Sequence, residues 1–130
     1  MNIVRVVAAA GISWLVPLVT AFTMYGRDGQ LMVSYWLFKA AMIVVLVVTA
    51  LVSFRWVYAG WIGPLPGLGV WFAIGLAAIT INIGLDVPTV MRLQQTGLKQ
   101  YAIEVGVVYL IFIVVSIVMG AGAAREVVNA

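Results

Sequence analysis

Four long apolar runs, separated by short polar interruptions, dominate the pattern of this chain. They cover approximately residues 4–24, 31–54, 68–85 and 101–121, and each is close to the roughly 20 residues that a membrane-crossing helix needs. A membrane β-strand would need only about ten residues with strict alternation of apolar and polar positions. The pattern therefore predicts an all-α integral membrane protein: a four-transmembrane-helix bundle with short loops, in which residues 1–130 form a single membrane domain.

Three interruptions join the predicted helices. Residues 26–30 contain two glycines and an aspartate, a composition typical of a tight turn. Residues 56–67 combine glycines and prolines with aromatic rings that favour the headgroup layer, so this connection is expected at the membrane interface. Residues 92–100 are the most polar stretch and are predicted to form a loop on the same side as Arg27. Four spans place both termini on the other side.

The end of the third run departs from the apolar pattern, since an amide, a carboxylate and a proline fall within seven residues, at Asn82, Asp86 and Pro88. Pro88 cannot donate a backbone hydrogen bond to the carbonyl of Gly84. The helix is therefore expected either to end near residue 85, or to continue to residue 93 with a kink at Gly84 and Pro88. A carbonyl freed in this way is available to water, to Lys39 or to a bound cation, as in the broken helices of transporters.

Composition narrows the possible chemistry. Hydrophobic residues make up 65% of the chain and charged residues 8%, far from the usage of soluble proteins. The absence of cysteine and histidine removes thiol chemistry and the usual zinc and haem ligands. No phosphate-binding or nucleophile motif is present, so we expect no catalytic residues, no metal and no cofactor. The few basic residues suit anionic lipid headgroups and are too sparse for nucleic acid.

Counting residues along the helices places several ionisable groups at one depth. Lys39 lies 16 residues before Arg55, or roughly 24 Å along a helix. Asp86 lies 18 residues after Leu68, or roughly 27 Å. The second and third helices are expected to be antiparallel neighbours, because a short connection joins them. Lys39 and Asp86 are then level and able to pair, with Lys39 as the counter-charge of Asp86.

Other polar side chains fall in the same layer. Glu104 enters it about one turn inside the fourth run. Ionisable groups within membrane spans are costly, and they usually pair or face a wet cavity, which makes them functional candidates. We therefore predict a polar or ion-pair site formed by Lys39, Asp86, Glu104 and Asn82, with Tyr35, Tyr101 and Arg92 within a turn or two in depth.

A purely structural interpretation competes with this site. Asp86 followed by Pro88 is also a typical helix start, in which Asp86 caps an interfacial helix over residues 87–96 and faces water. Lys39 would then extend towards the headgroups, and Glu104 would only flank the polar loop. Trp14, in the middle of the first run, either contacts a substrate or, as packing statistics favour, fills space against a neighbouring helix.

The orientation in the membrane is not determined by charge. Each side carries three basic residues, so that either the termini are cytoplasmic or the chain inserts both ways and forms antiparallel dimers. The basic residues on the side of the termini are Arg5, Arg55 and Arg125, and those on the other side are Arg27, Arg92 and Lys99.

Two functions remain open at this stage, both for a multi-pass protein of the cell membrane, which we expect to be a prokaryotic inner membrane. The leading hypothesis is a transporter or channel-like protein that binds a small solute or ion at the polar layer and forms a homo-oligomer or associates with other membrane subunits. The alternative is an accessory or scaffold subunit without activity of its own, which docks onto a larger complex through small residues of the third helix such as Gly75 and Ala78. A third class, a membrane enzyme that acts on lipid, would need a polar pocket open to the headgroup layer.

Overall fold

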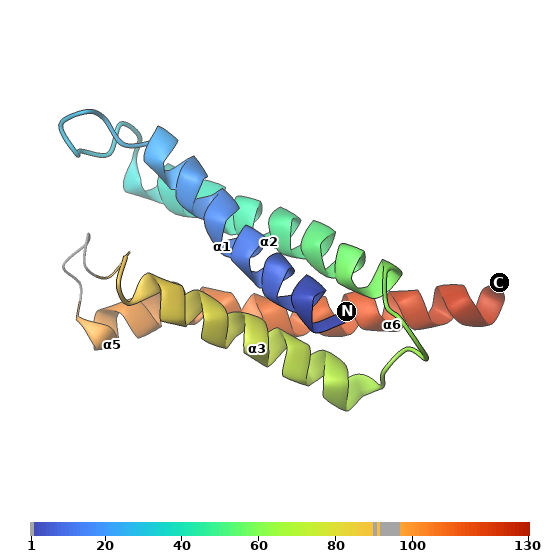
Figure 1. Cartoon of the computed structure of the whole chain (residues 1–130). Helices are drawn as coiled ribbons and strands as arrows, with labels where there is room; N and C mark the ends of the chain where they lie inside the picture. The colour runs from blue at the N-terminus through green and yellow to red at the C-terminus, as the bar shows by residue number, and fades with distance from the viewer. Residues whose placement is uncertain (1, 90, 92–96) are drawn as a thin grey trace.

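The computed structural model describes residues 2–89, 91 and 97–130 (Figure 1). Among these residues, four helical stretches of 19 to 25 residues are long and apolar enough to cross a membrane, the last of them counted from Val108 to Asn129. The all-helical class with four candidate membrane spans is thus confirmed. The elements in chain order are α1 (Asn2–Thr23), α2 (Tyr35–Ala59), α3 (Leu68–Asp86), α5 (Leu98–Tyr101), the π-helical segment η1 (Ala102–Gly106), the 3-10 turn η2 (Val108–Leu110) and α6 (Ile111–Asn129).

The turn between α1 and α2 closes as a small hairpin. The backbone N–H of Gly26 donates to the carbonyl of Gln30 at 2.8 Å, and Gly29 has φ +76°, a left-handed conformation that suits glycine. The Ser34 hydroxyl then caps α2 by accepting a hydrogen bond from the N–H of Leu37 at 3.3 Å. The hairpin and the cap together explain why α2 begins at Tyr35, four residues later than the apolar run suggests.

Two helix ends differ from the sequence prediction, and the end of α3 agrees with the shorter of its two predicted limits. α2 continues past Arg55 to Ala59, so that part of the aromatic connection is helical. α6 continues to Asn129, and Arg125 therefore lies on the helix and not in a tail. α3 ends at Asp86, near the shorter predicted limit, and Pro88 follows in a turn, so that no kink at Pro88 is observed. The longer alternative, ending at residue 93, falls outside the described residues.

The four long helices pack in a ring, and each packs mainly against two others. α1 packs against α2 and α3, and α6 packs against the same two helices from the opposite side. α2 and α3 are consequently diagonal across the bundle, although they follow one another in the chain. Their connection, residues 60–67, is long enough for this, since eight extended residues reach roughly 26 Å. The prediction that α2 and α3 are adjacent is therefore wrong.

Small residues bring α3 and α6 into close contact. A Cβ atom on Gly75 would lie 2.7 Å from the Cα of Ile113 and 2.9 Å from the carbonyl oxygen of Phe112. A Cβ atom on Gly120 would lie 2.5 Å from the indole ring of Trp71. Close backbone approach of this kind is typical of packed membrane helices. Gly75 and Ala78 are both buried inside the bundle, so they are not available as the external docking face that the scaffold hypothesis assigned to them.

A buried hydrogen-bond chain crosses the same region. The Ser116 hydroxyl donates to the backbone carbonyl of Trp71 at 2.7 Å. Because a serine hydroxyl has a single proton, the 2.7 Å contact between Tyr58 and Ser116 must have the Tyr58 hydroxyl as donor. The chain links α2, α6 and α3, and satisfies two hydroxyl groups in an apolar environment.

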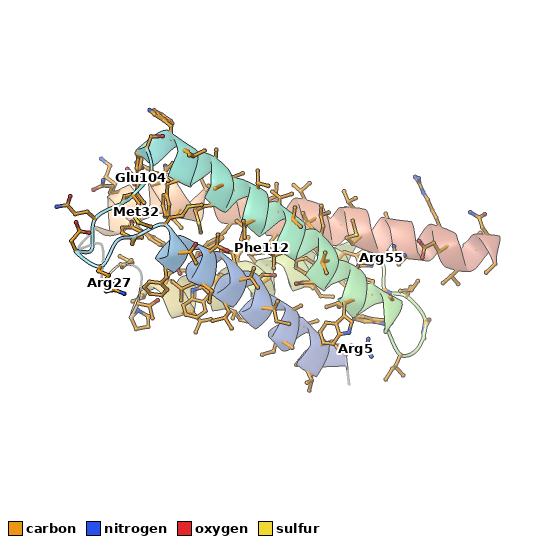
Figure 2. The ribbon with its side chains drawn as sticks, turned by 90° about the horizontal axis from the view of Figure 1, so that it is seen from above. Arg5, Arg27, Met32, Arg55, Glu104 and Phe112 are labelled. Atoms are coloured by element: carbon orange, nitrogen blue, oxygen red, sulfur yellow. The ribbon has the colours of Figure 1, made fainter. Side chains whose placement is uncertain are left out.

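The two ends of the bundle differ in character (Figure 2). Arg5 and Arg55 lie at one end, which we call the terminal end, and Arg27 and Glu104 lie at the other, the loop end, with Phe112 between them. The terminal end is closed by direct contacts. Arg5 stacks over the ring of Trp56 at 5.2 Å and donates to the Trp56 carbonyl at 3.3 Å. The side-chain amide of Asn2 exchanges two 3.1 Å hydrogen bonds with the backbone of Ile62.

The Gly75 contact predicts a position-specific effect of one methyl group. Gly75→Ala should lower the stability of the protein by about 1–3 kcal/mol, the usual cost of overpacking, because the new methyl meets backbone atoms that cannot turn away. Gly84→Ala is the matched control on the same helix, since a Cβ there meets nothing within 4 Å, and alanine should leave stability unchanged or raise it. Thermal unfolding of the purified variants in detergent measures both. Equal melting temperatures for the two variants would contradict the close α3–α6 contact.

Candidate functional site

A cavity of about 650 Å³ opens at the loop end of the bundle. Its size lies within the range of small-molecule sites, roughly 300–1,000 Å³. Figure 1 shows α1 and α2 diverging from α3 and α5 towards this end. Aromatic and aliphatic side chains form most of the wall, and the polar groups within it are few. The charged residues that line the cavity are Arg27, Lys39, Asp86 and Glu104, and its aromatic residues are Trp14, Phe22, Tyr25, Phe38 and Tyr109.

Asp86 is the most deeply buried charged residue of the cavity wall, with 1% of its surface exposed. Its carboxylate accepts three hydrogen bonds from the residues that the structure describes. The indole N–H of Trp14 donates to Oδ1 at 2.8 Å, and the hydroxyls of Tyr101 and Tyr109 donate to Oδ2 at 2.5 Å and 2.6 Å. The alternative in which Asp86 caps a surface helix and faces water is therefore wrong for this side chain.

The position of Asp86 opposes local helix preferences. It is the last residue of α3, where the helix dipole is negative and disfavours a carboxylate. The helix end is satisfied by other groups: the Thr89 hydroxyl donates to the Leu85 carbonyl at 2.6 Å, and the Thr89 N–H donates to the Asp86 carbonyl at 3.2 Å. Among the described residues, the Asp86 side chain accepts no capping hydrogen bond from the backbone. Residues that break local rules in this way are frequently functional.

An irregular stretch of chain brings two of the donors to Asp86. Tyr101 and Tyr109 are eight residues apart, which in a regular α-helix means a separation of about 12 Å along the axis and about 80° around it. Between them the chain forms the π-helical η1 and then enters the 3-10 turn η2. The change in winding brings both hydroxyls to the same carboxylate oxygen. π-helical segments are often found at functional sites.

Asn82 lies one turn before Asp86 on α3 and is fully buried. Its amide nitrogen donates to the carbonyls of Ala10 and Ala78 at 3.3 Å and 2.9 Å. It therefore joins α3 to α1 and is not a cavity-lining group. Within the described part of the chain, its Oδ1 atom and the hydroxyl of Ser13 are buried without a hydrogen-bond partner.

Ser13 does line the cavity, as does Pro17 one turn later on α1. Pro17 has no N–H to donate to the Ser13 carbonyl. The wall of α1 therefore offers a serine whose hydroxyl has no partner among the described residues and whose carbonyl lacks its usual helical donor. Ser13 is only 1% exposed, so this polar spot lies behind the surface of the cavity and does not contact a bound molecule.

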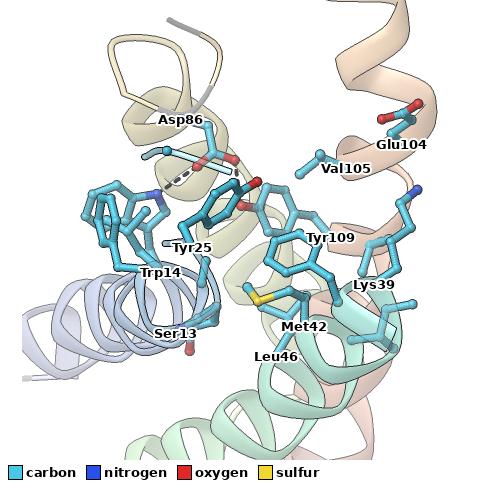
Figure 3. A pocket seen from close by; sticks show the side chains of 18 of the residues that line it. Ser13, Trp14, Tyr25, Lys39, Met42, Leu46, Asp86, Glu104, Val105 and Tyr109 are labelled. Atoms are coloured by element: carbon cyan, nitrogen blue, oxygen red, sulfur yellow. Dashed lines mark hydrogen bonds between the residues drawn. The ribbon is translucent and has the colours of Figure 1, made fainter. Parts of the chain in front are cut away.

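Lys39 and Glu104 reach the same cavity but do not pair with Asp86. In Figure 3 they lie on one side of the cavity, with Asp86 and Trp14 on the other and Tyr109 between them. The Lys39 amine lies 5.5 Å from the centre of the Tyr35 ring. Glu104 accepts from Gln100 at 3.3 Å and from the Tyr35 hydroxyl at 3.5 Å. Lys39 is therefore not the counter-charge of Asp86, because the diagonal placement of α2 and α3 puts the bulk of the cavity between them.

Sequence reasoning found some members of this arrangement and missed others. The structure gathers Lys39, Asp86 and Glu104 around one cavity and places Asn82 behind it. Trp14 is a hydrogen-bond donor to Asp86 and not only a packing residue, and Tyr109 was not considered. The signal available for Trp14 was its polar N–H in the middle of an apolar run, which needs a partner when buried. Arg92, the remaining residue of the predicted layer, lies outside the described residues.

Comparison with protein-family models, with curated proteins and with solved structures gives no match. Across residues 2–89, 91 and 97–130, no three His, Cys, Asp or Glu side chains gather in a way that would hold a metal ion. What the arrangement offers chemically is a buried carboxylate held by neutral donors, a second carboxylate near the mouth, and aromatic walls.

The Trp14–Asp86 hydrogen bond can be tested by a substitution that keeps an aromatic ring. Trp14→Phe removes the N–H donor and should lower stability by about 1.5–3 kcal/mol, the range for hydrogen bonds to charged groups. Trp36→Phe is the control, because Trp36 is 79% exposed and faces away from the bundle. Thermal unfolding in detergent, read by circular dichroism, compares the two. A loss no greater than that of the control would mean that the indole contributes packing alone.

Proposed function

We propose that this chain is a multi-pass protein of a prokaryotic inner membrane that binds a small solute or ion in the cavity at its loop end and moves it across the bilayer. The observation that carries the proposal is the carboxylate of Asp86 in the wall of that cavity. Ionisable groups at such positions in membrane proteins usually mark the path of an ion or substrate. The function is argued from this site, because a helical bundle by itself does not imply one.

The roles of the four predicted site residues follow from their contacts. Asp86 attracts the solute or accepts a proton, and its three donors hold the carboxylate in place. Glu104, half-buried near the mouth, supplies the second carboxylate. Lys39 contributes a positive charge to the cavity from the wall opposite Asp86. Asn82 acts on structure, since its amide nitrogen joins α3 to α1.

The closed terminal end and the open loop end support a transport role. Contacts of Arg5 with Trp56 and of Asn2 with Ile62 close one end, while the cavity opens at the other. A transporter exposes its central site to one side at a time. We propose that the structure corresponds to the state open at the loop end, and that the protein functions as a homo-oligomer.

If the protein is instead an accessory subunit, a smaller surface of α3 is available for docking onto a partner. Gly75 and Ala78 pack inside the bundle, whereas Gly69, Ala73 and Gly84 are exposed on α3. Small exposed residues permit close approach of another helix. In this case substitutions on the exposed face should remove a partner from the purified complex, and substitutions in the cavity should not affect function.

The absence of cysteine from the chain makes access to the cavity directly measurable. In protein reconstituted into nanodiscs, Met42→Cys should react with a water-soluble thiol reagent, since Met42 lines the cavity. Val44→Cys, two residues later on α2, should remain unmodified, because Val44 is 61% exposed on the outer surface of the bundle, where lipid is expected. Mass spectrometry measures the fraction of each variant that is modified. An unreactive thiol in the Met42→Cys variant would mean that the cavity is closed to solutes, and would overturn the proposed function.

Flux should depend on the carboxylates. For a solute that protects the thiol of the Met42→Cys variant from modification, uptake into proteoliposomes should fall at least about tenfold with Asp86→Asn, the equivalent of about 1.4 kcal/mol. Asn has one acceptor oxygen where the carboxylate has two, so the Asp86→Asn variant cannot accept all three hydrogen bonds equally well. Circular dichroism is therefore used to check that this variant retains its helices. Glu104→Gln provides a second variant whose weaker and more exposed contacts leave the fold intact. Uptake equal to that of the unmodified chain in both variants would contradict the roles given to Asp86 and Glu104.

A further inference from the structure

We propose that the solute taken into this cavity is an organic monocation, a quaternary or protonated amine that carries aromatic or aliphatic groups. The inference rests on the proposed function and names the class of ligand. It follows from three features of the cavity: the partners of its carboxylates, the places of its two cations, and the chemistry of its walls.

Among the described residues, neither carboxylate of the cavity has a cationic partner. Asp86 accepts there from the indole of Trp14 and the hydroxyls of Tyr101 and Tyr109. Glu104 accepts from the amide of Gln100 and, at 3.5 Å, from the Tyr35 hydroxyl. Neutral donors stabilise a negative charge without cancelling it. Lys39 and Arg27 also line the cavity, so that a negative potential is expected around Asp86 in particular, where a cationic ligand would balance it.

The two cations that line the cavity leave the charge of Asp86 unpaired. Lys39 has its amine over the ring of Tyr35, on the same side of the cavity as Glu104 and opposite Asp86 (Figure 3). Arg27 lies in the exposed turn between α1 and α2, where water and salt screen its charge. Neither forms an ion pair with Asp86 or Glu104, and in the part of the chain that the structure describes the only ion pair is that of Arg55 with Glu126 at the terminal end.

The walls favour an organic cation over a bare metal ion. A metal ion would need several oxygen, nitrogen or sulfur ligands at close range, and the wall around Asp86 consists largely of rings and aliphatic side chains. Aromatic faces attract cations, most strongly where water is excluded. They also provide contact area for the apolar part of a ligand. The rings available for this purpose are those of Trp14, Phe22, Tyr25, Phe38 and Tyr109.

The burial of Asp86 limits how it acts. With 1% of its surface exposed, the carboxylate has little direct contact with the cavity, but its field extends across a wall of low dielectric constant. Three of the roughly four acceptor positions of a carboxylate are already used. Asp86 thus selects the charge of the ligand, whereas Glu104, which is only half-buried, is placed to contact it.

The sign of the ligand charge can be tested with two thiol reagents of similar size. The Met42→Cys variant in nanodiscs is treated with trimethylammonium-ethyl methanethiosulfonate, a cation, and with sulfonatoethyl methanethiosulfonate, an anion. At the cavity thiol, the modification rate with the cation is divided by the rate with the anion, and this ratio is normalised to the same ratio at the exposed control Asn129→Cys. The normalised ratio should be about ten or more, as expected for a nearby unit charge in a partly desolvated site. A ratio at or below unity would overturn the inference.

Charge variants give predictions of opposite sign. In the Met42→Cys background, Glu104→Gln and Asp86→Asn should lower the normalised ratio, while Lys39→Gln should raise it. If these substitutions only altered packing, the modification rates with both reagents would change in parallel and the ratio would stay constant. A constant ratio would therefore contradict the inference. Because Lys39 and Glu104 are half-buried at the mouth, their variants keep the test valid even if Asp86→Asn fails to fold.

Binding is tested by protection of the same cavity thiol. Benzyltrimethylammonium should slow the modification of the Met42→Cys variant, whereas phenylmethanesulfonate, an anion of similar size, should not. Protection by the anion, or equal protection by both, would overturn the cation assignment and leave the proposed function standing. If the thiol of the Met42→Cys variant reacts with neither methanethiosulfonate reagent, the cavity is closed to solutes, and this result would contradict the proposed function itself.

Discussion

The carboxylate of Asp86 is the group on which the arrangement of the loop end depends. An isolated charge in an apolar environment costs several kcal/mol or more, so it persists only where donors meet it. These donors come from three separate parts of the chain: Trp14 on α1, Tyr101 at the end of α5 and Tyr109 in η2. The need to satisfy one side chain therefore fixes α1, α3 and the irregular start of the fourth span relative to one another.

The two halves of the bundle are packed differently. Near the terminal end, Gly75 and Gly120 let α6 approach α3 and Trp71 so closely that a methyl group would collide. Buried rings fill the space beside this contact, since Phe54 packs edge-on against Phe112. At the loop end, rings and aliphatic side chains line a cavity instead of filling it.

Run length and composition were sufficient to predict four apolar helices, and the cluster from Asn82 to Pro88 correctly indicated an unusual helix end. The spatial order of the helices was not predictable in the same way. A connection of eight residues reaches a diagonal helix as easily as an adjacent one, and so the expected pairing of Lys39 with Asp86 failed. Tyr109 was missed because it meets Asp86 only through the altered winding of η1 and η2, and apolar periodicity carries no signal for a π-helical segment.

The choice of neutral donors has a consequence that an ion pair would not have. Had Lys39 paired with Asp86, the two charges would have cancelled, and the cavity wall would present only a weak dipole. Indole and phenol groups lower the energy of the carboxylate by hydrogen bonding but leave its net charge in place. The C-terminal end of α3, on which Asp86 lies, adds a negative potential of the same sign. Both effects act together, so the stability of the buried charge and its attraction for a cation arise from the same contacts.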